Sequence, residues 1–163
     1  MRLEDVHRGE RIFIDTNIFT YLLVKDKRYI NSVKSFLKKV EGGFYTGFFN
    51  LTVFDETSFN FIKLKVIKKY GIKRGEFSDF YKQNPNLVRE IDFEPVLKLF
   101  SIDNLNLLTP KLILELVTEF SSEYALLPAD AIILATMKEH SIVNLASNDH
   151  DFERVDWITL YKP

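Results

Sequence analysis

The sequence predicts an α/β fold in which a mostly parallel sheet of about five strands is covered by helices on both faces. Short apolar runs alternate along the chain with longer segments whose apolar residues recur at helical spacing. Such alternation favours parallel strands joined by helical crossovers. Acidic residues also recur where predicted strands give way to turns or helices, the edge at which open α/β sheets bind ligands. The predicted strands are residues 11–15, 44–49, 104–108, 142–146 and 157–161.

The predicted helices lie between these strands. Residues 30–40 place apolar side chains on one helical face, and Gly42-Gly43 supplies the glycine that commonly ends a helix. Residues 70–95 are interpreted as short helical pieces and turns, because glycines and prolines, Pro85 and Pro95 among them, interrupt the segment. Pro110 is expected at a helix start. The other predicted helices are residues 18–24, 51–69, 112–124 and 127–140.

Length and composition limit the class of protein. With 163 residues and no linker or repeat, residues 1–163 are expected to form a single domain. No apolar stretch approaches the roughly 18 to 20 residues that span a bilayer, so no membrane partner is expected. The charged N-terminus is unlike a signal peptide, and the absence of cysteine excludes disulfides and zinc–thiolate sites. We expect a soluble, cytoplasmic protein.

The net charge of −1 neither supports nor excludes a nucleic-acid substrate, because phosphate contacts can come from a local basic patch. One basic stretch has the composition of such a patch. A solvated helix face is the favoured interpretation of this stretch, and contact with a phosphate backbone is the alternative. The stretch contains Lys63, Lys65, Lys68, Lys69, Lys73 and Arg74.

Two acidic positions stand near the start of predicted helices. Asp15 follows the first strand, where it can cap the next helix, and Thr16 and Asn17 beside it suit supporting hydrogen bonds to a metal or phosphate site. Asp55 and Glu56 interrupt an apolar helical start, where acids also favour the positive end of the helix dipole. Since consecutive helical residues point about 100° apart, only one of this pair can face the strand ends, and spacing does not choose between them.

Two further acidic positions lie in the C-terminal third. Asp130 is the only charge in an apolar helical run, so it should be protonated, paired or metal-bound, unless it simply meets free N–H groups in the first turn. Asp149 follows the fourth strand and is expected to point toward the strand ends. Asp151 can be an outer metal ligand or a helix cap. His150 is expected to be exposed and without a role.

Carboxylates that converge on one edge of a sheet need a cation, because like charges at short range raise one another's pKa. Hard divalent cations such as Mg²⁺ take oxygen ligands of this kind. The chain has no Gly-rich phosphate loop, no GxGxxG and no GxSxG, which disfavours nucleoside-triphosphate, dinucleotide and acyl-transfer chemistry. The pattern therefore predicts a metal-dependent phosphodiester site.

Four motifs resemble those of the PIN-domain ribonucleases, in an order that covers nearly the whole chain from about residue 11. They are Phe13-Ile14-Asp15-Thr16-Asn17, the helix start that carries Glu56, Pro128-Ala129-Asp130-Ala131-Ile132 and Ser147-Asn148-Asp149-His150-Asp151-Phe152. The resemblance implies a three-layer α/β/α sandwich around the sheet. Many small members are toxins of the VapC type, paired with an antitoxin and often homodimeric, and others process or degrade RNA.

The resemblance also implies a mechanism. One or two Mg²⁺ or Mn²⁺ ions would be held by Asp15, Glu56, Asp130 and Asp149, with Asp151 in reserve and Thr16 and Asn17 as supporting groups. The expected reaction is endonucleolytic cleavage of single-stranded RNA by water, which leaves a 5′-phosphate and a 3′-hydroxyl.

Three alternatives to the toxin hypothesis remain at this point. The chain can be a housekeeping RNA-processing nuclease, or a catalytically silent PIN-like module that binds RNA or a protein partner. Four unpaired carboxylates count against the silent module. A phosphotransferase that forms an aspartyl-phosphate on Asp15 ranks last, because the residue two positions on is Asn17 rather than a second Asp.

Overall fold

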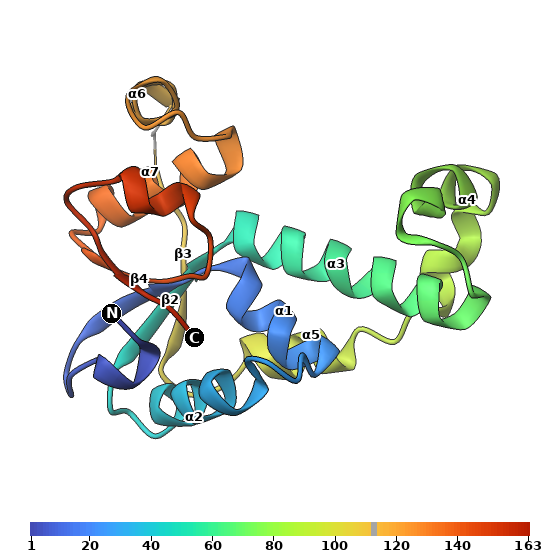
Figure 1. Ribbon diagram of the computed structural model, residues 1–163, viewed down its shortest axis with the longest axis horizontal. Helices are drawn as coiled ribbons and strands as arrows, with labels where there is room; N and C mark the ends of the chain where they lie inside the picture. Colours follow the sequence, from blue (N-terminus) through green and yellow to red (C-terminus); the bar gives the residue numbers. More distant parts are fainter. Residues whose placement is uncertain (112–113) are drawn as a thin grey trace.

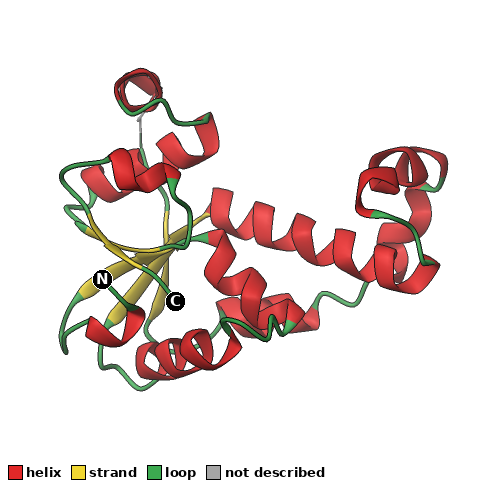
Figure 2. Cartoon of the chain, viewed as in Figure 1, coloured by secondary structure: helices red, strands yellow, loops and turns green. Residues whose placement is uncertain are grey.

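The sheet in the computed structural model, which describes residues 1–111 and 114–163, has five parallel strands in the order β3-β2-β1-β4-β5 (Figures 1 and 2). This confirms the α/β fold with a five-stranded parallel sheet flanked by helices. The strands are β1 (Arg11–Ile14), β2 (Thr46–Asn50), β3 (Leu105–Leu108), β4 (Asn144–Ala146) and β5 (Thr159–Tyr161).

The central strand, β1, is covered by helices on both faces of the sheet. Ile12, Phe13 and Ile14 of β1 are all fully buried, as expected for a strand that has helices on each face. On β2, a side chain at Gly47 would lie 2.9 Å from Val40 and 3.0 Å from Ile14, so only glycine allows this close approach.

The helices form one layer on each face of the sheet (Figure 2). One layer contains α1 (Thr16–Val24), α2 (Ile30–Glu41) and α5 (Glu94–Phe100), and the other contains α6 (Leu114–Glu123) and α7 (Pro128–Glu139). The chain moves outward from β1 to β3 and then returns across the sheet to β4. The reversal makes β1 and β4 the switch point at which ligands bind in such folds.

The 20-residue helix α3 (Leu51–Tyr70) begins at the sheet and extends well beyond it (Figure 1). Its distal part carries a short helix, α4 (Phe77–Gln83), and two 3₁₀ turns, η2 (Arg74–Glu76) and η3 (Pro85–Glu90). A small apolar cluster of Val66, Phe77 and Leu87, separate from the main core, holds these pieces together. We call residues 62–91, which include this cluster, the arm.

The element boundaries differ from the predicted ones in two informative places. Helix α5 was not predicted, because Pro95 was interpreted as a breaker, whereas it lies in the first turn of α5, and Pro85 likewise begins η3. Proline is tolerated there because first-turn N–H groups have no partner inside the helix. The predicted helix at 112–124 is described from Leu114 onward, and its residues 112–113 lie outside the described residues.

The two ends of the described chain meet beside β5. A 3₁₀ turn, η1 (Leu3–Asp5), follows Arg2, which forms a parallel bridge with Lys162. The Leu3 N–H donates to the Lys162 carbonyl at 2.8 Å, and the Lys162 N–H donates to the Met1 carbonyl at 2.9 Å. A last 3₁₀ turn, η4 (Asp151–Arg154), links β4 to β5. Within the described ranges, no helix has the length and apolar character needed to cross a membrane.

Candidate functional site

Asp15 lies at the carboxyl end of β1 and caps α1, as the sequence predicts. Its side chain is 5 % exposed and accepts hydrogen bonds from the Thr16 N–H at 2.6 Å, from the Ser147 hydroxyl at 2.6 Å and from the Asn17 amide. These donors hold both carboxylate oxygens in fixed directions. Burial nevertheless dominates, and it raises the pKa of Asp15 to about 7.

A hydrogen-bond network ties the start of α1 to the end of β4. The Asn17 amide donates to Ser147 Oγ at 2.9 Å, and its oxygen accepts from the Asn148 N–H at 3.0 Å. The Asn148 amide in turn donates to the Tyr21 hydroxyl at 3.0 Å. Asn17 therefore connects the start of α1 with the loop that follows β4.

Glu56 faces the strand ends, whereas Asp55 is exposed to solvent. The Thr16 hydroxyl donates to Glu56 Oε2 at 2.7 Å, so α1 fixes the direction of a side chain on α3. This geometry chooses between the adjacent acids, a choice that the sequence left open. Asn50 begins α3 by capping Val53 at 3.1 Å, and its amide donates to Thr136 at 2.9 Å, which ties α3 to α7.

Asp130 reaches the same edge from the first turn of a helix and not from the end of a strand. Helix α6 lies between β3 and α7, in the order that the sequence predicts. Since α7 leads directly into β4, it runs antiparallel to the strands, and its N-terminus lies at their carboxyl ends. Burial raises the pKa of Asp130 to about 6, with further contributions from Asp149 and Glu56.

The loop after β4 presents two more acids. Asp149 Oδ1 accepts the Asp151 N–H at 2.9 Å, which closes a tight turn. Asp151 begins η4 and pairs with Arg154 at 2.8 Å, so its carboxylate is already partly neutralised. His150 is exposed, as expected, and its Nδ1 lies 2.9 Å from Glu153 Oε1.

The four predicted acids thus come together from four distant segments of the chain. Glu56 and Asp130 both raise the pKa of Asp15, and Asp149, Glu56 and Asp151 raise that of Asp130. Arg154 opposes this effect on Asp130. Among residues 1–111 and 114–163, no three of the acidic or histidine side chains are already arranged to hold an ion. The donor set is nevertheless all carboxylate and mutually repulsive, which fits a hard divalent cation.

Three contacts at this edge were not predicted from the sequence. Ser147 donates to Asp15, Tyr21 supports Asn148, and Arg154 pairs with Asp151. The Asp151–Arg154 spacing of three residues is visible in the sequence and could have indicated the ion pair. The roles of Ser147 and Tyr21 depend on how β1 and β4 pair, which local sequence does not specify.

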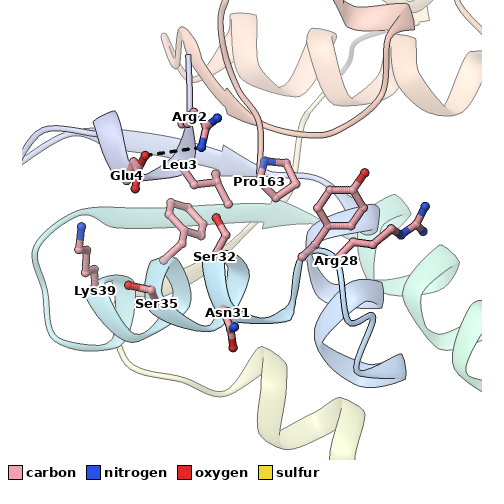
Figure 3. Close-up of a pocket in the computed structure, with 11 residues that line it drawn as sticks. Arg2, Leu3, Glu4, Arg28, Asn31, Ser32, Ser35, Lys39 and Pro163 are labelled. Carbon is pink, nitrogen blue, oxygen red and sulfur yellow. Dashed lines mark ion pairs between the residues drawn. The ribbon is translucent and has the colours of Figure 1, made fainter.

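A separate cavity of about 440 Å³ lies between α2 and the chain ends, away from these acids (Figure 3). Its three cations do not converge, since Arg28 and Lys39 lie at opposite ends of the cavity and Arg2 pairs with Glu4 at 3.9 Å. The Arg28 guanidinium also donates two hydrogen bonds to the Asp26 carboxylate, from Nε at 3.1 Å and from Nη2 at 2.7 Å. The cavity therefore lacks the focused charge of an anion site.

A five-stranded parallel sheet with acids gathered at its central carboxyl edge defines the class of protein. The chain belongs to the PIN-domain family, whose model matches residues 12–158. This family of ribonucleases is generally metal-dependent.

The chain is homologous to VapC ribonucleases. It is 32% identical over 151 residues to Ribonuclease VapC2 of Methanocaldococcus jannaschii, and the match covers 92% of both chains. It is 34% identical over 155 residues to Ribonuclease VapC6 of the same organism, covering 93% of this chain and 96% of the relative.

A solved structure shares the fold. It is the crystal structure of VapBC2 from Rickettsia felis bound to a DNA fragment from their promoter. The TM-score is 0.52 at 18% identity, with 93% of this chain and 98% of the other covered. At this identity the likeness concerns the fold.

Proposed function

We propose that this chain is a metal-dependent endoribonuclease that cleaves single-stranded RNA and serves as the toxin of a toxin–antitoxin pair. The observation that carries the proposal is the convergence of Asp15, Glu56, Asp130 and Asp149 on one edge of the sheet. Homology to two VapC ribonucleases over more than nine-tenths of the chain supports RNA as the substrate.

The cofactor in this proposal is one or two Mg²⁺ or Mn²⁺ ions held by these four carboxylates. When bound, the metal favours hydroxide over water near neutral pH and offsets the charge that develops on the phosphate. Asp151 ranks behind the four as a ligand, because its pairing with Arg154 competes for the same oxygens.

The supporting residues then have distinct tasks. Thr16 orients Glu56, and Ser147 and Asn17 orient Asp15, so the carboxylates keep their directions as the substrate arrives. Because buried Asp15 has a raised pKa, it gives up its proton near neutral pH when a cation enters the site. Water attack would leave a 5′-phosphate and a 3′-hydroxyl.

The proposed partners follow from the relatives. An antitoxin protein would bind this chain, by analogy with the VapBC2 assembly of Rickettsia felis. The proposal includes a homodimer and a cytoplasmic location. It also includes a single domain over residues 1–163, since the two ribonuclease relatives match more than nine-tenths of the chain.

The test is cleavage of end-labelled single-stranded RNAs by wild type and by Asp15→Asn, each with Mn²⁺, with Mg²⁺ and with EDTA. Asp15→Asn keeps the shape of the side chain and removes the charge that binds metal. We expect cleavage by wild type with metal alone, and products that carry 5′-phosphates.

Two controls make the result decisive. Circular dichroism shows whether Asp15→Asn is folded, and calorimetry measures divalent-ion binding independently of the RNA chosen. A folded wild type that neither cleaves any of a varied set of RNAs nor binds Mn²⁺ would contradict the proposal and favour a catalytically silent binding module.

A further inference from the structure

Part of the basic stretch that begins on α3 lines a groove. The groove leads away from the strand ends where Asp15, Glu56, Asp130 and Asp149 gather, which we call the acidic edge. Helices α1 and α3 pack against each other near the sheet, and α3 then extends into the arm (Figure 1). Two hollows of about 460 and about 250 Å³ lie along this junction and share Leu64 and Ile67 as walls. We call them together the α1–α3 groove.

The groove carries positive charge without negative charge. Lys25, Lys65 and Lys68 line the larger hollow, and Lys63 and Arg74 line the smaller one. Within the part of the chain that the structure describes, no carboxylate lines either hollow and none of these five cations forms an ion pair. Lys69 lines neither hollow and pairs with Glu90 at 2.5 Å, beside a further hollow that Lys65 and Lys68 also line. Unpaired cations in one concave surface attract an anionic ligand.

On both helices, residues that line the groove lie about one turn beyond residues of the acidic edge. On α3, Glu56, Asn60 and Lys63 are spaced i, i+4 and i+7, so they lie along one face. On α1, Thr20 lies one turn beyond Thr16, the residue that orients Glu56. Thr20 and Asn60 both line the smaller hollow, about 6 Å along their helices from Thr16 and Glu56 respectively. The buried Thr20 hydroxyl has no hydrogen-bond partner among the described residues.

We propose that the α1–α3 groove binds the phosphate backbone of the single-stranded RNA on one side of the scissile bond. This inference rests on the proposed function, because it extends the substrate of the same site. Cations beside apolar walls suit a single strand, which exposes both phosphates and base faces. Lys63 and Arg74 hold the phosphates nearest the cleavage site, and Lys25, Lys65 and Lys68 hold those farther out.

The test is the salt dependence of RNA binding in EDTA, which keeps the RNA intact. Wild type is compared with Lys63→Gln/Arg74→Gln and with a matched control, Lys34→Gln/Lys38→Gln, which removes the same charge from exposed positions on α2. Oligonucleotides of about 4 and about 16 nucleotides bracket the footprint of a single-strand site.

For the longer RNA, we expect the groove variant to bind about tenfold more weakly at 0.1 M salt, with the slope of log K against log[salt] reduced by about 1 to 1.5. The control should behave as wild type, and Lys63→Arg should retain the wild-type slope.

Several outcomes would overturn this proposal without affecting the nuclease. Equal slopes for the groove and control variants would do so, provided that their unfolding temperatures match that of wild type. A groove variant that loses antitoxin binding while it binds RNA normally would reassign the groove to a protein partner. Failure of the nuclease itself would appear separately, as absent cleavage of both RNAs by wild type.

Discussion

The acidic edge and the arm are built on opposite principles. The acids come from four segments that only the complete sheet brings together, and they repel one another. The arm is assembled from consecutive residues around Val66, Phe77 and Leu87. Of its cations, Lys69 and Lys82 form ion pairs, whereas Lys63 and Arg74 form none among the described residues. The edge therefore depends on the global fold, whereas the arm has an apolar cluster of its own and is expected to change locally with little effect on the sheet.

The largest effect should come from neutralising one acid at the edge. Glu56→Gln should lower the rate of RNA cleavage about a thousandfold, a loss typical of removing a group that stabilises transition-state charge. Asp55→Asn is the matched control on the same helix, and it should cleave at the wild-type rate because its side chain is exposed. Single-turnover cleavage with Mn²⁺ measures both. Equal losses in the two variants would remove the basis for assigning Glu56.

The next effect separates the arm from the sheet. Phe77→Ala removes the largest buried side chain of the arm cluster and should destabilise the arm by about 3 kcal/mol. Hydrogen exchange should accelerate across residues 62–91 and remain slow in β1 and β4. Phe13→Ala in the main core should instead lower the protection of the whole chain. Uniform acceleration in Phe77→Ala would show that the arm and sheet unfold as one unit.

The pH dependence of stability should report the repulsion at the edge. Without metal, the folded protein holds a proton on Asp15 up to about pH 7, whereas the unfolded chain releases it near the ordinary value of 3.8. The free energy of unfolding should therefore fall by about 3 to 4 kcal/mol as the pH rises from about 4 to about 7.

Urea denaturation in EDTA across this pH range measures the effect. Asp15→Asn should flatten the profile, because it removes the main titrating group, and Asp130, with a smaller rise in pKa, contributes in the same direction. Saturating Mg²⁺ should restore stability at high pH, since it binds the folded ionised form. A stability that rises with pH in EDTA would contradict the buried state of Asp15.

The smallest expected effect is the change in stability when either of two glycines is replaced by alanine. Gly47→Ala would place a methyl group 2.9 to 3.1 Å from three buried side chains and should cost about 2 kcal/mol. Gly75→Ala in the arm meets no atom within 4 Å and should change stability by less than about 1 kcal/mol. Thermal unfolding measures both. Similar losses would mean that the arm is packed more tightly than the structure shows.

The sequence predicts the parts of this molecule that depend on local patterns. Apolar runs locate all five strands, and the four motifs around Asp15, Glu56, Asp130 and Asp149 predict the PIN-domain family correctly. Pro95 was misinterpreted, because proline both breaks helices and begins them. The choice of Glu56 over Asp55 requires the contact with Thr16, which exists because α1 and α3 pack together. Pairing across the sheet places Ser147 beside Asp15, and no local pattern encodes that contact.

The bridge between Arg2 and Lys162 has a consequence for how the protein behaves at high concentration. Strand β5 ends the sheet, and an uncovered edge strand is a template for pairing with another chain. The first residues of the chain form hydrogen bonds with the Lys162 N–H and carbonyl on that side. They therefore block the addition of a strand from another molecule there. A version of the protein that lacked residues 1–3 would keep every acid of the site, yet would expose an edge at which aggregation can begin.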